Sequence, residues 1–227
     1  MKNLFLKILL LGFITSNIFA AVEDDPLLYK FSAEKFEITT GDDNPFNWDV
    51  DFMIGKDLNK FYLYSEGTYV NSEISESENS IVYSRAITSL WDFQSGLAYD
   101  TVPNENNLWL TFGFQGLAPY FFESRVNFLI DDDGNIGLRA DIDYDLLLTQ
   151  KLILTPSLAT SLYTKNNEKM EIGSGLSSTS LSLRLRYEFV REFAPYIGVQ
   201  WDKTYGNTQD HEDINETEIV FGVKFWF

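Results

Sequence analysis

Apolar and polar residues alternate with a period of two over most of the chain after residue 25. Between residues 180 and 189, leucine and aromatic residues hold the odd positions, and serine, arginine and glutamate hold the even positions. The same alternation runs through 136–146 and 217–227. Because side chains two positions apart lie on the same face of a strand, the pattern predicts β-strands with one apolar and one polar face.

This alternation predicts about twelve strands, separated by turn residues. Their expected spans are 27–40, 46–56, 60–74, 79–89, 91–101, 107–116, 119–130, 136–147, 150–163, 177–190, 193–203 and 217–227. The apolar positions of the first strand change face between Phe31 and Phe36. That change predicts a β-bulge, or a plug role for this segment.

The connections between these strands are expected to alternate in length. Short turns are predicted at 56–59, 88–90, 117–118, 148–150 and 190–192, and longer links at 41–45, 75–78, 102–106, 131–135, 164–176 and 204–216. Bacterial outer-membrane barrels have short periplasmic turns and longer external loops. An even number of strands then places both termini on the periplasmic side.

The predicted fold is all-β: a transmembrane antiparallel β-barrel of the bacterial outer-membrane type, formed by residues 21–227. A soluble β-sandwich or an aqueous barrel would also alternate. Here, however, the apolar face is continuous around nearly all strands and the opposite face is charged, whereas a soluble barrel needs an apolar interior. The aromatic ending Phe225-Trp226-Phe227 also favours the membrane barrel.

The first twenty residues have the features of a cleaved signal peptide. Lys2 and Lys7 supply positive charge, residues 4–14 are otherwise apolar, and Ala20 and Ala21 offer a cleavage site. The alternative is a membrane anchor, but a spanning helix needs about 20 apolar residues. We therefore expect residues 1–20 to be a signal peptide and the mature protein to reside in the outer membrane.

Composition narrows the range of functions. The 34 acidic and 17 basic residues give a formal net charge of −17, which disfavours nucleic acid as a partner and attracts cations. The 16% of aromatic residues is too high for a disordered acidic chain. Because the sequence contains no cysteine, disulfides, thiolate metal sites and cysteine nucleophiles are excluded.

The candidate metal ligands are Asp49, Asp51 and Met53, which share one face of a predicted strand, and His211 in an acidic loop. Carboxylates suit hard cations and thioethers suit Cu(I). Two interpretations of the inward charges stay open: an ion-pair network that fills the lumen without a function, or a path or site for cations. His211 is the sole histidine and has no aligned serine, so we expect no hydrolase and no other enzymatic activity.

Several long segments resemble the copper resistance protein B family. They are WLTFGFQGLAPYFFE at 109–123, DLLLTQKLIL at 145–154, LRLRYE at 183–188, REFAPYIGV at 191–199 and GVKFWF at 222–227. The resemblance implies an outer-membrane copper resistance protein of a Gram-negative bacterium, which binds copper ions loosely or helps them cross the membrane. It also implies outer-membrane lipid as surroundings and a periplasmic copper-binding protein as a partner.

The chain departs from this family before the first strand. Many members carry a segment rich in methionine and histidine there, whereas residues 21–26 contain neither. Asp49, Asp51, Met53 and His211 are therefore the expected copper ligands. The alternative function is a porin-like or structural barrel with no role in metal handling.

Overall fold

The structure, a computed structural model, describes residues 25–41, 43–103, 105–210 and 213–227. The predicted signal peptide at 1–20 and His211 lie outside the described residues, and both stay predictions. The strands are β1 (Leu28–Thr39), β2 (Phe46–Gly55), β3 (Asn59–Val70), β4 (Glu73–Ala86), β5 (Trp91–Val102), β6 (Glu105–Ala118), β7 (Phe122–Ile130), β8 (Ile136–Asp143), β9 (Leu146–Leu147), β10 (Leu152–Tyr163), β11 (Gly175–Tyr187), β12 (Phe193–Thr204) and β13 (Asn215–Trp226). Short helical turns are η2 (Pro119–Phe121), η3 (Glu168–Met170) and α2 (Gly206–Gln209).

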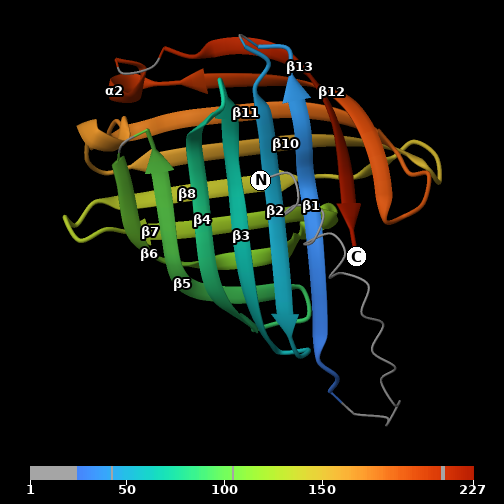
Figure 1. Cartoon of the computed structure of the whole chain (residues 1–227). Helices are drawn as coiled ribbons and strands as arrows, with labels where there is room; N and C mark the ends of the chain where they lie inside the picture. Colours follow the sequence, from blue (N-terminus) through green and yellow to red (C-terminus); the bar gives the residue numbers. More distant parts are fainter. Residues whose placement is uncertain (1–24, 42, 104, 211–212) are drawn as a thin grey trace, which may run out of the picture.

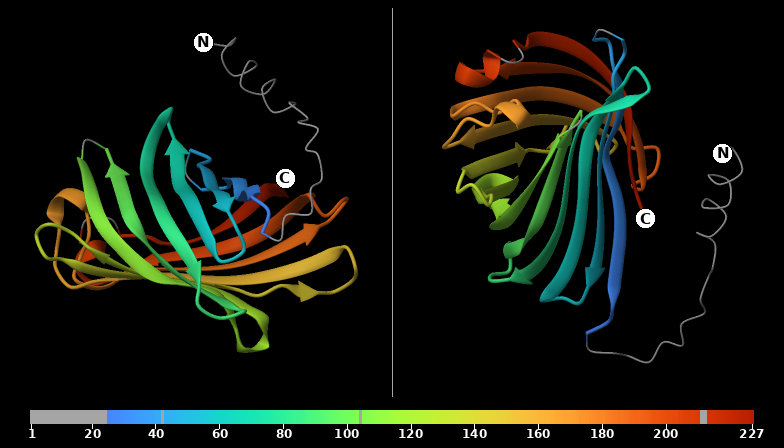
Figure 2. Two further views of the ribbon diagram at one scale, coloured as in Figure 1. Left: turned by 90° about the horizontal axis from the view of Figure 1, so that it is seen from below. Right: turned by 60° about the vertical axis from the view of Figure 1, so that its left-hand side comes forward.

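These strands form one antiparallel sheet that curves around and closes on itself (Figures 1 and 2). Neighbours along the chain pair with each other, and β13 pairs with β1 to close the ring. At that seam, the backbone amide of Phe227 donates to the carbonyl of Phe31 at 3.0 Å, and the return bond measures 2.9 Å. The aromatic C-terminal residue therefore takes part in barrel closure.

The predicted number of strands is confirmed. Thirteen strands are present, but β8 and β9 both pair with β10 in one unbroken register and together make one wall strand, which leaves twelve. The interruption lies opposite Pro156, whose carbonyl accepts from the Tyr144 amide at 3.1 Å. Because proline has no amide hydrogen, it cannot return that bond, and the ladder is weakened there.

The start of β1 and the C-terminal residue Phe227 lie at one end of the barrel, and α2 lies at the other (Figure 1). Following the sequence prediction, we call the end with the start of β1 and Phe227 the periplasmic rim and the opposite end the external rim. No helix of the described residues is long and apolar enough to cross a membrane.

The predicted bulge in the first strand is confirmed. The register of β1 shifts against β2 between Ala33 and Lys35, and against β13 between Ala33 and Glu37. The extra residue changes the inward positions from even-numbered ones, such as Lys30, to odd-numbered ones, so Glu37 points into the barrel. Its side chain is 1% exposed.

Two of the longer links predicted for the external rim are wrong. The expected loop at 75–78 belongs to β4, and the turn before it consists of Asn71 and Ser72, with φ of 52° and 70°. The expected link at 102–106 is similarly short, since β5 ends at Val102 and β6 begins at Glu105. The apolar band of such barrels is about 25 Å tall. Strand segments beyond it can be polar on both faces, and their sequence then looks like a loop.

The predicted strand at 119–130 begins late for a different reason. Residues 119–121 form the turn η2, in which Tyr120 and Phe121 have φ of 67° and 68°. Two consecutive left-handed residues reverse the chain, so β7 starts at Phe122. Both aromatic side chains of this turn are exposed at the periplasmic rim.

The large apolar side chains point away from the barrel interior. Leu181, Leu183 and Ile197 are each more than 40% exposed, whereas the neighbouring Arg184 and Arg186 are buried inside. This arrangement is the one expected of a barrel in lipid. The interior departs from the prediction at one place, where Ala98, Trp109, Leu129 and Tyr163 form a buried apolar cluster.

Candidate functional site in the barrel lumen

The lumen contains two cavities, one on each side of a belt of charged side chains. The larger cavity, about 400 Å³, lies toward the periplasmic rim, and the smaller one, about 140 Å³, lies toward the external rim. We call them the periplasmic chamber and the external chamber. The charged belt consists of the ionic side chains that line both, which are Lys35, Asp49, Glu66, Arg125 and Asp141.

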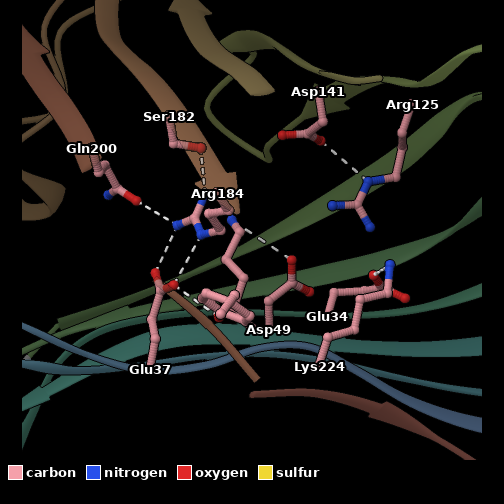
Figure 3. Close-up of polar contacts among 11 residues, drawn as sticks. Glu34, Glu37, Asp49, Arg125, Asp141, Ser182, Arg184, Gln200 and Lys224 are labelled. Atoms are coloured by element: carbon pink, nitrogen blue, oxygen red, sulfur yellow. Dashed lines mark hydrogen bonds and ion pairs between the residues drawn. The ribbon is translucent and has the colours of Figure 1, made fainter. Parts of the chain in front are cut away.

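Ion pairs between neighbouring strands, together with one contact across the lumen, hold the charged belt in place. The Lys35 ammonium lies 3.7 Å from the Asp49 carboxylate, and the Arg125 Nε lies 3.2 Å from the Asp141 carboxylate. The Arg125 guanidinium also lies 5.0 Å from the ring centre of Tyr64, which is on β3. Figure 3 shows Arg125 and Asp141 facing Asp49 across the interior. Arg125 thus bridges the β3 and β8 walls of the lumen.

The charged belt has an excess of negative charge. It contains three carboxylates and two basic groups. Glu66, on β3, makes no hydrogen bond or ion pair with the described residues, although its side chain lines both chambers. Glu66 interacts with Arg125 and Lys35 only through longer-range electrostatics, and a carboxylate that forms no ion pair in a narrow lumen attracts a mobile cation.

Asp49, Asp51 and Met53 occupy successive inward positions of β2, as the sequence predicts. All three line the periplasmic chamber. Met53 lies in register with Lys30 on β1 and with Tyr62 on β3. The structure therefore places these three predicted residues in one chamber, while His211 lies outside the described part of the chain.

The periplasmic chamber as a whole is acidic. Its lining includes six basic residues (Lys30, Lys35, Arg125, Arg184, Arg186 and Lys224) and eight acidic ones (Glu34, Asp49, Asp51, Glu66, Glu123, Asp141, Asp143 and Asp145). Asp51 and Glu123 make no hydrogen bond or ion pair with the described residues. The formal net charge of the lining is −2, so a hydrated cation entering the chamber is attracted rather than repelled.

The described residues contain no preformed cluster of three or more histidine, cysteine or acidic side chains that could hold a metal ion. The separated carboxylates and the single thioether suit brief contacts with a passing cation more than a rigid coordination shell. Such a shell needs a set of ligands fixed at short distances.

The remaining inward charges form structural ion pairs. Arg184 binds Glu37 and also reaches Gln200 and Ser182 (Figure 3). Near the external rim, Arg139 pairs with both Asp100 and Glu78. Buried charges need such partners. The prediction of an inward ion-pair network is thus confirmed for these residues.

The alternation within 136–146 and 180–189 places Arg139 and Arg184 on the polar face of their strands, but it does not reveal three of their acidic partners. Glu37 was hidden by the bulge in β1, and Glu78 lay in a segment expected to be a loop. Asp100 was available from the alternation of β5, where it shares a face with the inward-pointing Ala98. Its signal was present but weak, because its strand carries few other charges.

Comparison with known proteins places the chain in a family. The family model described as "Copper resistance protein B precursor (CopB)" matches residues 27–227. The chain belongs to the copper resistance protein B family. The resemblance seen in the sequence is confirmed, and with it a role in copper resistance.

Two relatives carry this family name. Copper resistance protein B of Escherichia coli is 38% identical over 213 residues, which cover 91% of this chain and 72% of the relative. The copper resistance protein B homolog of Pseudomonas syringae pv. tomato is 36% identical over 219 residues, covering 94% of this chain and 74% of the relative. The family assignment therefore rests on nearly the whole described barrel.

Two solved porins are similar in fold to this copper resistance protein B member. The KdgM porin has a TM-score of 0.55 at 14% identity, covering 87% of this chain and 99% of that one. The NanC porin has a TM-score of 0.55 at 11% identity, with the same coverage. Identities this low carry information on fold alone. Together with the family, they place the protein in the outer membrane.

Proposed function

We propose that this barrel lets copper ions cross the outer membrane through its lumen and binds them weakly in the periplasmic chamber. Copper is the cargo in this proposal, not a resident cofactor, and no catalytic step is involved. The observation that carries the proposal is the acidic chamber inside a barrel of a copper resistance family. A periplasmic copper-binding protein would exchange ions with the chamber at the periplasmic rim.

The ligand chemistry of the chamber supports weak binding of both copper ions. Asp51 is an oxygen donor that makes no hydrogen bond or ion pair among the described residues, and it precedes Met53 by two positions on the same face of β2. Thioethers favour Cu(I), and carboxylates accept harder cations such as Cu(II). One thioether and a few carboxylates give a site that an ion can leave, as passage requires.

The test of binding uses the purified, refolded barrel in detergent. Isothermal titration with Cu(I) and with Cu(II), in separate experiments, is compared between the wild type and the triple variant Asp49→Ala, Asp51→Ala, Met53→Ala. We expect weaker binding of at least one ion in the variant. The control is Asp132→Ala, Asp133→Ala, Leu58→Ala, which also removes two carboxylates and one apolar side chain but at exposed turns. Equal affinities in all three proteins would refute the chamber as the binding site.

The test of passage uses cells and vesicles. A deletion strain should show altered copper tolerance together with altered periplasmic copper, and the wild-type gene should restore both. Purified barrel in lipid vesicles should admit copper to an enclosed indicator. If it instead gives a large, unselective conductance in planar bilayers, the porin-like alternative replaces the copper path.

A further inference from the structure

The apolar cluster inside the barrel is not explained by an ion-lined lumen. Trp109 on β6 is completely buried, and its indole Nε1 donates to Asp100 at 2.7 Å. Its strand neighbours Leu108 and Leu110 are each 55% exposed on the lipid side, so Trp109 points inward. Tyr163, at the external end of β10, packs against the same cluster. A buried inward tryptophan needs something in the lumen that covers it.

The covering group comes from the link between β10 and β11. Ile172 of this link packs against the apolar cluster, and Met170 is 5% exposed. The helical turn η3 in the same link lies against β6. In the sheet, β6 is separated from β10 by β7 and β8. The link 164–174 must therefore fold inward over the mouth of the lumen to reach β6.

Hydrogen bonds tie this segment down on the side of α2. The Gly173 amide donates to the Thr208 hydroxyl at 2.8 Å, and the Asn207 side chain donates to Asn166 at 3.0 Å. A Cβ added to Gly173 would lie 2.2 Å from the Thr208 amide nitrogen, so only glycine fits this contact. On the other side, Lys165 donates to the carbonyl of Asp133 at 2.6 Å.

We propose that segment 164–174 is an internal constriction of the lumen at the external rim, held inside by Ile172 on the Trp109 cluster. The segment narrows the half of the mouth bounded by β6–β10. It thereby sets the size of solute that can pass, whichever ion uses the path. This inference does not depend on copper, because the constriction acts on any small solute.

Conductance in planar bilayers, with potassium chloride as the probe, tests the constriction. The first variant replaces residues 166–173 with a short Gly-Ser turn and should conduct several-fold more than the wild type. The second variant, Ile172→Ser, keeps the full link. Its channels should switch more often than wild-type channels to the higher conductance expected of the shortened variant. The control, Ile136→Ser, makes the same chemical change at an exposed position near the same rim and should conduct like the wild type.

An engineered disulfide distinguishes displacement of segment 164–174 from a general loss of barrel structure. The chain has no cysteine, so Asn166→Cys with Asn207→Cys introduces a single pair at side chains already in contact. When this pair is added to Ile172→Ser, oxidation should return the conductance to the wild-type level, and a reductant should release it. The proposal is overturned if the shortened and wild-type barrels, both folded by heat-dependent gel mobility, conduct equally. It is also overturned if oxidation of the cysteine pair has no effect.

Discussion

Arg184 and Glu37 form a two-point ion pair inside the barrel, between strands that are not neighbours. The Arg184 Nε lies 2.9 Å from Glu37 Oε2, and its Nη2 lies 2.7 Å from Oε1. Arg184 is on β11 and Glu37 on β1, with β12 and β13 between them. The Tyr196 hydroxyl, from the intervening β12, donates to the same carboxylate at 2.8 Å. The pair ties together the two sides of the seam where the barrel closes.

Removing one partner of this pair should destabilise the barrel strongly. Glu37→Ala leaves Arg184 buried without its counter-charge, which costs about 3–5 kcal/mol in the free energy of unfolding. Urea unfolding in detergent, followed by tryptophan fluorescence, measures the loss. The double variant Glu37→Leu, Arg184→Met removes both charges and should recover much of the stability. If the double variant is as unstable as Glu37→Ala, the loss does not come from the unpaired charge.

The lipid-facing surface can be tested by placing a charge on it. Leu181 lies near the middle of β11 and points outward beside Leu158. Leu181→Arg should destabilise the barrel folded in lipid vesicles by about 2–4 kcal/mol, because the charged side chain is placed in hydrocarbon. Leu58→Arg, in a turn at the periplasmic rim, should cost about 1 kcal/mol or less. Equal costs at the two positions would contradict the predicted position of the membrane.

The charged belt should control both conductance and ion selectivity. Arg125→Met removes the side chain that bridges the lumen between the two chambers and leaves the belt with three carboxylates and one base. Conductance should rise, and the reversal potential across a potassium chloride gradient should shift toward higher cation selectivity. Arg191→Met changes the same charge at an exposed turn and serves as the control. An unchanged reversal potential in Arg125→Met would show that ions do not pass the belt.

Conservative changes at β2 should separate the two copper ions. Met53→Leu keeps the volume but removes the thioether, so Cu(I) affinity should fall and Cu(II) affinity should not. Asp51→Asn removes a charge instead and should weaken Cu(II) more than Cu(I). Titration of each ion into each purified variant gives the four affinities. Asp57→Asn, at an exposed turn, is the control for loss of a carboxylate, and the same response of both ions to Met53→Leu would argue against a thioether ligand.

Much of the fold could be predicted from the sequence, because the alternation of residues such as Leu181, Arg184 and Leu185 reports directly which side of a strand meets lipid. The bulge in β1 was also visible, since the apolar positions change face between Phe31 and Phe36. Errors were concentrated where the lipid no longer imposes a pattern. The segment 75–78 is polar on both faces near the external rim, so it looked like a loop although it continues β4.

The candidate site was predicted only in part, for a related reason. The inward orientation of Asp49, Asp51 and Met53 follows from the alternation of side chains along a single strand. The charged belt does not, because it joins side chains from β1, β2, β3, β7 and β8 whose relative heights depend on the register between strands. The partners of Arg184 and Arg139 likewise became known only once that register placed Glu37 and Asp100 beside them.

The sequence by itself determined that this chain is an outer-membrane barrel of the copper resistance protein B family, since lipid and backbone pairing impose a short-range pattern that residues show directly. The tertiary structure decided how the interior is divided: two chambers, a belt between them, and a segment folded over Trp109. Those features depend on contacts between strands far apart in the chain. Closure of the sheet, completed by the hydrogen bonds between Phe31 and Phe227, is what makes those strands face one another.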